Sequence, residues 1–337
     1  MTAPTMKALR THAVGGPETL TVDDVDVPVP GKGEVLVAVK ACAINYPDTL
    51  MIRDLYQFKP ERPYAPGGEI AGVVEAVGEG VDGVSVGDRV MAGIGNGGLA
   101  EKVIVPAGRM FPVPEGVAFE KAASLLMTYG TTIHGLKDRG HIKEGDTVLV
   151  LGAAGGVGLS AVELAKAFGA RVVAAVSSEE KGEVARKAGA DEVVIYPKEE
   201  MDKAASKDLA NAFKAACGPE GANIVYDIVG GQYSEPALRS IAWEGRFLVV
   251  GFPAGIARMP LNLTLLKSCD IAGVFWGAFT AREPVKFRQQ VEELFQLMED
   301  GKIDPLVSET FPLERGGDAI AKLENRQAVG KLVVTMD

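Results

Sequence analysis

A glycine-rich stretch, GAAGGVG, lies between an apolar run and an amphipathic one, and this arrangement can hold a phosphate group. The apolar run 147–152 is typical of a buried strand, and the helical spacing of apolar side chains after residue 156 predicts a helix that ends at Gly169. The first backbone amides of a helix have no partner within it, and the helix dipole favours an anion there. We therefore expect this turn to bind a phosphate or a diphosphate.

The turn also fits the frame Gly-x-Gly-x-x-Gly that binds dinucleotides, with Ala153, Gly155 and Gly158 at its three positions. Gly155 would let the backbone approach a diphosphate, and Gly158 would let the helix pack closely on the strand. A glycine-rich turn that only packs a helix on a strand is the alternative. The strand–turn–helix unit around the frame favours nucleotide binding. The contacts that we expect at the turn are Ala153, Gly155, Gly156, Val157 and Gly158.

The end of the next predicted strand bears on the choice between NAD and NADP. Sites that select NAD usually carry an acidic residue about 20 residues beyond the glycine loop. Here Val176, Ser177 and Ser178 occupy that region, and Lys181 follows one turn later, so hydroxyls and a cation stand where a 2′-phosphate would bind. The alternative is that Ser177 caps the following helix, with Glu180 completing a capping box, while Lys181 is a solvated surface residue. A serine here could cap the helix and also bind the 2′-phosphate. The hydroxyls and the cation at the end of this strand favour NADP.

One carboxylate, Glu69, lies between a Pro-Gly-Gly turn and the apolar run IAGVV. An ionised carboxylate in an apolar layer is costly unless a partner compensates it. Glu69 should therefore face a metal ion, a cationic side chain or a reacting substrate. Neither the three histidines nor the three cysteines of the chain show the spacing of a metal site.

The elements that would position these groups fall into two regions. Roughly the first 115 residues contain short valine-rich runs separated by Gly and Pro, which predicts a compact β-rich domain. From about residue 122, short apolar strands alternate with amphipathic helices, which is the pattern of a doubly wound parallel sheet. In this second region we expect strands over 147–152, 171–176, 192–196, 223–229, 246–251 and 270–276, and a helix over 283–300.

Composition sets limits on the class of protein. The chain has 337 residues, 47% of them hydrophobic and 24% charged, which is ordinary for a globular protein and long enough for two domains. A formal charge of -10 without a basic run disfavours nucleic acid as a partner. The longest uncharged run is shorter than the roughly 20 residues of a membrane span, and the N-terminus lacks a secretory stretch. Because its cysteines are few and separated, we expect a cytoplasmic protein that binds no membrane.

These stretches together resemble the medium-chain dehydrogenase/reductase superfamily. The segments GVDGVSVGDRV, AASLLMTYGTTIHGL, VLVLGAAGGVGLSAVELAKAFGARV and GKLVV follow one another over essentially the whole chain. The sequence is most similar to the zinc-free, zeta-crystallin-like quinone oxidoreductase branch. The resemblance implies an α/β fold with a GroES-like β-rich catalytic domain over 1–125, completed by 278–337. It also implies a Rossmann domain over 126–277 that binds NADPH.

The positions of the superfamily's zinc ligands carry other residues in this chain. Zinc-containing members have a Cys where this sequence has Asn45 and a His where it has Gly68, and Met127 fills the third ligand position. Their four-cysteine lobe is missing between Gly87 and Val105. Asn, Gly and Met cannot form the three-ligand open site that catalytic zinc requires. The resemblance therefore implies a site without a metal.

The same resemblance suggests a partner for the carboxylate in the apolar strand. With no zinc to compensate Glu69, the superfamily's pattern makes Lys331 in VGKLVV the candidate cation. The pair would then be mainly structural, because a buried carboxylate and a buried ammonium compensate each other.

The resemblance also implies the remaining site residues. Asn45 and Tyr46 from the first domain, and Thr128 and Tyr129 from the start of the second, are the implied catalytic residues. For the two tyrosines a packing role is equally open. The implied cofactor contacts beyond the glycine loop and the serine–lysine group are Asn45, Thr128, Tyr196, Gly230, Gly231, Gly251, Phe252, Phe275, Trp276, Gly277 and Lys331.

The function that follows from the resemblance is hydride transfer from NADPH without a Lewis acid. The acceptor should then be electrophilic already, as a quinone or an α,β-unsaturated carbonyl is. One alternative is an acyl-CoA enone such as acryloyl-CoA, for which Arg53, Lys59 and Arg62 form the nearest basic cluster. Another is an NADPH-binding structural or regulatory protein without turnover. The apolar segment Ile271–Gly277 is expected at a sheet edge, and the family pairs this edge across a twofold axis, so a homodimer is expected.

Overall fold

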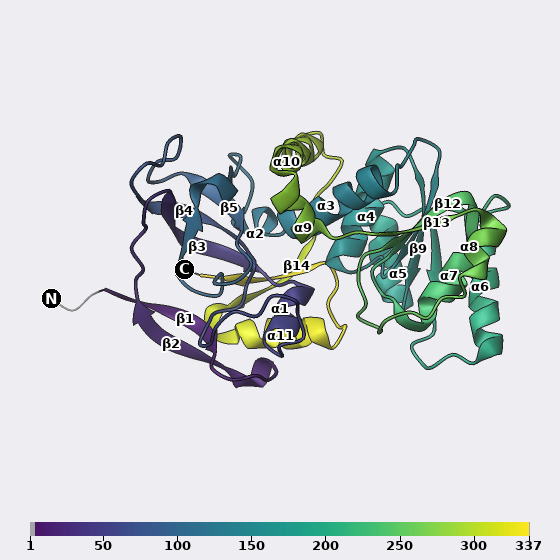
Figure 1. The fold of residues 1–337 in the computed structure, drawn as a ribbon, viewed down its shortest axis with the longest axis horizontal. Helices are drawn as coiled ribbons and strands as arrows, with labels where there is room; N and C mark the ends of the chain where they lie inside the picture. Colours follow the sequence, from purple (N-terminus) through teal and green to yellow (C-terminus); the bar gives the residue numbers. More distant parts are fainter. Residues whose placement is uncertain (1–3, 337) are drawn as a thin grey trace. The chain divides into compact units, whose positions relative to one another are not determined.

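The computed structural model describes residues 4–336, and they form two compact units (Figure 1). The first unit combines the chain up to Met127 with the chain from Pro305 onward. The second unit is Thr128–Asp304. The β-rich first unit and the parallel-sheet second unit confirm the predicted α/β fold class.

The boundary near the C-terminal part of the chain differs from the expected one. The sequence predicts that the catalytic domain resumes at residue 278, whereas 278–304 lies in the second unit. This segment contains helix α10 (Pro284–Glu299), which is tied to that unit by polar contacts. Lys137 Nζ lies 2.7 Å from Glu293 Oε2, and Gln290 Nε2 donates to Asp138 Oδ2 at 2.9 Å.

The second unit contains a six-stranded sheet in which all paired strands run parallel. Its strands are β8 (Thr147–Leu151), β9 (Arg171–Val176), β10 (Glu192–Ile195), β11 (Ala222–Asp227), β12 (Ile241–Val249) and β13 (Asp270–Gly273). The order β10-β9-β8-β11-β12-β13 reverses direction between β8 and β11, which confirms the doubly wound Rossmann arrangement. Sheets of this kind bind ligands at the carboxyl ends of the strands, where the order reverses.

Helices and short apolar side chains bury this sheet on both faces, as parallel strands require. On one face, Leu209 and Phe213 of α6 (Lys203–Cys217) pack with Leu149 and Val173. The neighbouring residues Val148 and Val172, which point to the opposite face, are also fully buried. The other helical segments of this region are α3 (Leu126–Ile133), the π-helical η3 (His134–Arg139), α4 (Gly156–Ala167), α5 (Glu179–Lys187), η4 (Gly231–Tyr233), α7 (Ser234–Arg239), α8 (Asn262–Lys267) and α9 (Trp276–Arg282).

The last predicted strand of this unit, 270–276, is too long. Strand β13 ends at Gly273, and the chain turns into α9 at Trp276. The reason is that the chain packs as a helix after Gly273: the Phe279 ring of α9 stacks on His134 with centroids 3.9 Å apart. A short apolar run does not by itself distinguish a strand from a buried helix, and here helix packing decides.

The first unit is built around a mixed sheet with the order β14-β15-β3-β4-β5-β7, and β6 pairs with β3 outside this path. All of its strand pairs are antiparallel except β14 with β15, which is parallel. Its strands are β1 (Thr5–Thr11), β2 (Leu20–Asp26), β3 (Glu34–Ala43), β4 (Glu69–Val77), β5 (Arg89–Gly93), β6 (Lys102–Pro106), β7 (Met110–Pro112), β14 (Val307–Pro312) and β15 (Lys331–Thr335). Its helical segments are η1 (Pro17–Thr19), α1 (Tyr46–Met51), η2 (Ala107–Arg109), α2 (Phe119–Ala122), η5 (Leu313–Arg315) and α11 (Gly316–Glu324).

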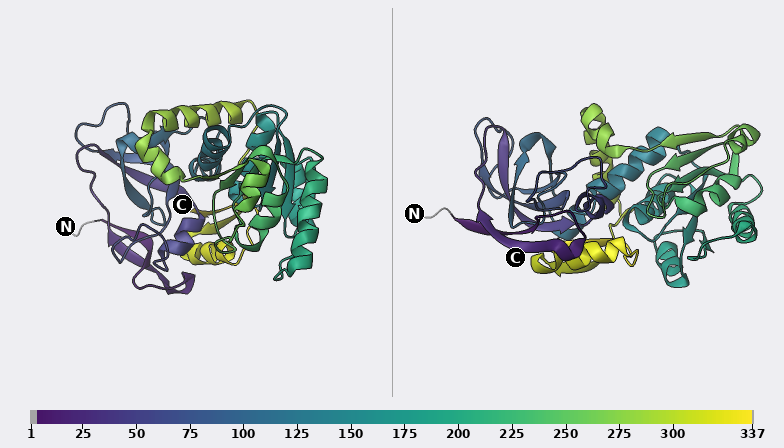
Figure 2. Two further views of the ribbon diagram at one scale, coloured as in Figure 1. Left: turned by 45° about the vertical axis from the view of Figure 1, so that its right-hand side comes forward. Right: turned by 60° about the horizontal axis from the view of Figure 1, so that its bottom comes forward.

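The C-terminal part of the chain completes this unit. Strand β15 pairs with β3 and brings Lys331 to the sheet, next to the loop that leads into α1. Helix α11, drawn in yellow, lies beside α1 in Figure 1 and Figure 2. Arg53, which follows α1, donates through Nε to Glu324 Oε1 of α11 at 2.6 Å. Residues 305–336 therefore contribute to the structure that positions Asn45.

None of the helices in the described part of the chain is both long enough and apolar enough to cross a lipid bilayer. The cytoplasmic location suggested by the cysteine content stays a prediction.

The close approach of α4 to β8 generates the first testable prediction. A Cβ added at Gly158 would lie 2.2 Å from the Gly152 carbonyl oxygen and 2.7 Å from the Ala153 Cα, and both are backbone atoms. Gly158→Ala should therefore lower the free energy of unfolding by about 1–3 kcal/mol or more. Denaturant unfolding measures the loss.

Gly155→Ala is the matched control in the same turn. A Cβ there would meet only the Gly152 oxygen at 3.6 Å, and the backbone of Gly155 is extended, with φ -80 and ψ 169. Its stability should stay within about 0.5 kcal/mol of the parent protein. Equal stability of the two variants would contradict the packing role given to Gly158.

Candidate active site

The glycine-rich turn between β8 and α4 has the geometry that the sequence predicts. Helix α4 starts at Gly156, no side chain caps its start at Gly155, and Gly152 has a positive φ of 72 degrees. The space around Gly155 is open, so its backbone is accessible to a ligand. Gly158, in contrast, lies so close to the backbone of Gly152 and Ala153 that a side chain would not fit. An uncapped helix start at the carboxyl end of β8 can hold a diphosphate through its backbone amides.

A buried carboxylate, Asp227, organises the neighbouring loop at the carboxyl end of β11. Asp227 Oδ1 accepts hydrogen bonds from Val229 N at 2.9 Å and Gly230 N at 2.8 Å, and Oδ2 accepts one from Ser234 Oγ at 2.6 Å. Its own carbonyl accepts from Gly251 N at 3.3 Å. Asp227 thus brings together two turns that the sequence predicts for the cofactor.

Asp227 itself is not among the residues that the sequence predicts for the site. Burial raises the pKa of its carboxyl group, and the three donors oppose that shift. The signal that could have identified it is an acid at the end of an otherwise apolar strand, directly before Ile-Val-Gly-Gly. Glu69 was found by the same kind of signal at the start of its strand.

The groups predicted for a 2′-phosphate lie together after β9. Ser178, not Ser177, is the N-cap of α5, and its hydroxyl accepts a hydrogen bond from Lys181 N at 3.4 Å. The capping box expected from Ser177 to Glu180 is therefore wrong: the helix begins at Glu179, and its third residue, Lys181, has no side-chain acceptor to complete a box with Ser178. A serine does cap this helix, as the alternative expected, but it is Ser178. Ser177 is half-buried beside it.

The remaining predicted cofactor residues of this unit differ in their surroundings. Tyr196 is buried next to Tyr233, with ring centroids 4.5 Å apart. Phe252 and Phe275 are half or more exposed. Trp276 packs over α3, and its indole Nε1 is buried without a hydrogen-bond partner among the described residues.

In the first unit, Glu69 lies in a buried cluster with Lys331 and Asn45. Lys331 Nζ lies 3.7 Å from Glu69 Oε2, donates to Asn45 Oδ1 at 2.5 Å and donates to the Ile44 carbonyl at 3.1 Å. Glu69 Oε1 accepts a hydrogen bond from Met127 N at 2.8 Å. The predicted Glu69–Lys331 pair is confirmed, and both side chains are at least nine-tenths buried.

The cluster leaves few free donors for a ligand. The two amide hydrogens of Asn45 are directed to Glu69 Oε2 at 3.0 Å and to the Ala43 carbonyl at 3.2 Å. The ammonium of Lys331 has three acceptors around it for its three protons. Both residues, predicted as cofactor contacts, are occupied in holding each other and Glu69. Any contact of Asn45 with a ligand would have to use the second lone pair of Oδ1.

Burial dominates the electrostatics of this cluster. It raises the pKa of Glu69 and lowers the pKa of Lys331, and the attraction between the two groups opposes both shifts. Burial also raises the pKa of Asp48 to about 6, although its carboxylate accepts Asn45 N at 2.7 Å and Gly67 N at 3.0 Å. Asp48 therefore fixes the backbone at the start of α1, next to Asn45.

The residues present at the superfamily's zinc position do not fit a zinc ion. The Asn45 amide is engaged, Gly68 supplies no side chain, and a Cβ there would lie 3.0 Å from the Gly95 carbonyl oxygen. Lys331 places a positive charge beside Glu69 and close enough to Asp48 to interact with it, which opposes a second cation at this position. Across residues 4–336 no group of three or more His, Cys, Asp and Glu side chains is arranged to hold a metal ion.

The other predicted catalytic residues are distributed over both units. In the first unit, Tyr46 is half-buried at the first position of α1. In the second unit, Thr128 is buried in α3, and the hydroxyl of Tyr129 donates to Glu163 Oε2 at 2.7 Å. Burial and the charge of Glu163 raise the pKa of Tyr129 well above its usual range. This geometry favours the packing role for Tyr129.

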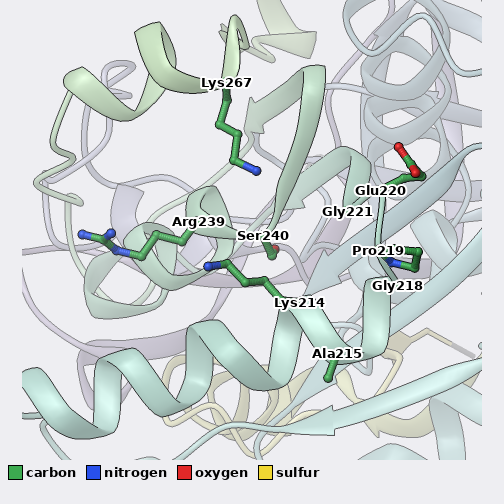
Figure 3. Close-up of a pocket in the computed structure, with 9 residues that line it drawn as sticks. All are labelled: Lys214, Ala215, Gly218, Pro219, Glu220, Gly221, Arg239, Ser240 and Lys267. Carbon is green, nitrogen blue, oxygen red and sulfur yellow. The ribbon is translucent and has the colours of Figure 1, made fainter.

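A surface hollow of about 560 Å³ in the second unit lies away from these groups (Figure 3). Gly221 and Ser240 line it directly before β11 and β12, so it lies at the amino end of the strands. Its cations, Lys214, Arg239 and Lys267, are in the last turns of α6, α7 and α8, where a positive charge compensates the helix dipole. The hollow is therefore explained by helix ends and is not the predicted cofactor site.

Comparison with known proteins agrees with this division into two units. Residues 31–115 match the family described as alcohol dehydrogenase GroES-like domain, and residues 156–300 match zinc-binding dehydrogenase. Quinone oxidoreductase-like protein 2 of Rattus norvegicus is 36% identical over 321 residues, which cover 95% of this chain and 89% of that protein.

Two solved structures extend the comparison. A mycobacterial protein described as complexed with NADPH superposes with a TM-score of 0.89 at 34% identity, covering 98% of this chain and 100% of the other. The quinone oxidoreductase of Escherichia coli, also complexed with NADPH, superposes with a TM-score of 0.88 at 29% identity and the same coverage. The chain belongs to the medium-chain dehydrogenase/reductase superfamily, in its quinone oxidoreductase branch.

The buried ion pair generates a second prediction. Lys331→Met removes the cation beside Glu69 and should lower the free energy of unfolding by about 3–5 kcal/mol, because an uncompensated carboxylate is left buried. Adding Glu69→Gln to this variant should recover part of the loss. Urea unfolding of both variants measures the effect.

The control is an ion pair of the same kind on the surface. Lys137 pairs with Glu293 at 2.7 Å, but both side chains are more than a third exposed. Lys137→Met should cost no more than about 1 kcal/mol. A loss at Lys331 no larger than at Lys137 would show that the buried pair does not hold the first unit together.

Proposed function

We propose that this protein is a zinc-independent, NADPH-dependent oxidoreductase that transfers hydride to a quinone or an α,β-unsaturated carbonyl. The observation that carries the proposal is the uncapped start of α4 at Gly155, next to the point where the strand order reverses. Two structural relatives that are described as complexed with NADPH support it.

Separate groups would bind separate parts of the cofactor. The turn from Ala153 to Gly158 would hold the diphosphate through backbone amides, because the start of α4 leaves them unpaired. Ser178 and Lys181 would hold the 2′-phosphate, with Tyr196 near the adenine. Gly230 and Gly251, positioned through Asp227, would line the neighbouring turns. When it is bound, the reduced nicotinamide supplies the hydride.

Zinc independence is proposed because an internal cation takes the metal's electrostatic role toward Glu69. Lys331 balances the carboxylate and holds the Asn45 amide in one orientation. Because Glu69 and the Ala43 carbonyl occupy both amide hydrogens of Asn45, this amide cannot stabilise a developing negative charge as a metal ion does. Acceptors that are already electrophilic, such as quinones and enones, fit this limited assistance.

Among the predicted catalytic hydroxyl groups, Tyr46 is the best candidate to donate a hydrogen bond to the acceptor. Its hydroxyl forms no hydrogen bond with the other described residues, whereas that of Tyr129 is bound to Glu163. Burial raises the pKa of Tyr46, so its hydroxyl stays protonated at neutral pH. Proton delivery to the product can then come from Tyr46 or from water.

The direct test is NADPH oxidation with a panel of quinones, enones and enoyl-CoAs, before and after chelation and dialysis. Activity with quinones or enones that survives chelation is expected. Tyr46→Phe should lower turnover with enones by no more than about 100-fold, the small end of acid–base effects. Lys32→Ala is a suitable control, since this exposed lysine lies outside the proposed machinery and outside the basic cluster considered for acyl-CoA.

Other outcomes of the panel would change the assignment. Turnover of enoyl-CoAs alone would favour the acyl-CoA alternative, and NADPH binding without turnover would favour a structural or regulatory protein. Activity that disappears on chelation and returns with zinc would remove the zinc-independent mechanism.

We also propose a homodimer that forms through β13. This strand is at the edge of its sheet, and an unpaired edge invites a second strand. Exposed apolar residues lie on it and on the preceding helix α8, among them Ile271, Leu265 and Leu266. Such a group of exposed apolar side chains is typical of a covered interface.

Sedimentation tests the assembly. The parent protein should sediment at twice the chain mass of 35.4 kDa, and Ile271→Lys should shift it toward the monomer. Val29→Lys, at a position 86% exposed in the first unit, is the control and should leave the dimer unchanged. A parent protein that is monomeric at micromolar concentration would exclude the proposal.

A further inference from the structure

The carboxyl ends of β9 and β10 place two lysines at one edge of the second unit. The strands are parallel neighbours, with Val176 opposite Ile195, and Tyr196 N donates to the Val176 carbonyl at 2.9 Å. The segment that follows β9 therefore lies beside the segment that follows β10. Lys181 comes from the first segment, and Lys198 comes from the second.

The loop that carries Lys198 is held in place on both sides of this residue. The Tyr233 hydroxyl donates to the Pro197 carbonyl at 2.8 Å. Gln232 Nε2 donates to the Glu199 carbonyl at 2.9 Å, and Met201 N donates to Gln232 Oε1 at 2.7 Å. These bonds fix the backbone around an exposed lysine, so its position is set by the fold.

Lys181 is in an electrostatically unfavourable position. Lys181 is the third residue of α5, where the helix dipole opposes a positive charge. Burial lowers the pKa of Lys181, and the charge of Lys198 adds to that shift, so the two ammonium groups are close enough to repel each other. By contrast, the basic residues around the surface hollow are at helix C-termini, where the dipole stabilises them.

An anion between the two lysines would remove the conflict. A ribose 2′-phosphate carries nearly two negative charges at neutral pH, as other phosphate monoesters do, and lysine binds phosphate as a point charge. The exposed acids Glu180 and Glu199 flank the lysines and weaken the positive field, so one lysine alone would hold a dianion poorly.

We propose that Lys198 is a second residue that determines the preference for NADPH, acting with Lys181 on the 2′-phosphate. The inference rests on the proposed function, because it requires the cofactor to lie along the glycine-rich turn. Lys198 is not part of the pattern that the sequence offers for NADP, since it follows a different strand. Its role is binding of the phosphate, and it takes no part in hydride transfer.

Fluorescence titration with NADPH and NADH tests the inference. Lys198→Ala should weaken NADPH binding about 3- to 10-fold, because an exposed charge-assisted contact is lost, and Lys198→Glu should weaken it more than about 10-fold. NADH binding should change less than about twofold in both variants, since NADH lacks the phosphate. The weakening should shrink at high salt.

Two comparisons separate the possible failures. Lys187→Ala removes the same charge from the exposed last turn of α5 and should leave both affinities unchanged. If Lys181→Ala weakens NADPH binding while Lys198→Ala behaves like Lys187→Ala, the role of Lys198 is wrong and the proposed function stands. If the parent protein binds neither nucleotide, the proposed function fails and the inference fails with it.

Discussion

The buried charge of Lys331 holds together the segments of the first unit that surround Asn45. It bonds to the loop before α1 through Ile44 and Asn45, and it balances Glu69 at the start of β4. Glu69 in turn accepts the backbone amide of Met127, where the first unit ends. Because the ammonium comes from β15, near the C-terminus, the position of Asn45 depends on a residue 286 positions away in the sequence.

The two units solve the same electrostatic problem in different ways. Glu69 is compensated by a full positive charge together with an amide and a backbone N–H. Asp227 is compensated only by neutral donors, two backbone amides and the Ser234 hydroxyl. Because these donors are neutral, Asp227 holds the loops after β11 and β12 without a cation beside it.

Much of this arrangement could be predicted from the sequence, because it depends on local patterns. The Gly155–Gly158 turn and the start of α4 follow from residue type and spacing, whereas the choice of Lys331 as the partner of Glu69 came from the family resemblance. The strand over 270–276 was mispredicted because an apolar run does not reveal whether a helix or a strand partner will bury it. The occupied donors of Asn45 and the bond from Tyr129 to Glu163 depend on residues far apart in the chain, which periodicity does not report.

In the second unit, the position of a lysine along its helix decides whether the helix dipole stabilises or destabilises its charge. Lys214 and Lys267 lie at the C-terminal ends of helices, where a lysine is stabilised by the helix dipole and needs no further partner. Lys181 lies in the first turn of α5, where the same dipole destabilises it, and the nearby Lys198 adds to the cost. A position that the protein's own field disfavours keeps a lysine at the expense of stability. The proposed 2′-phosphate would compensate the charges of both lysines, at the same strand ends that carry the glycine-rich turn.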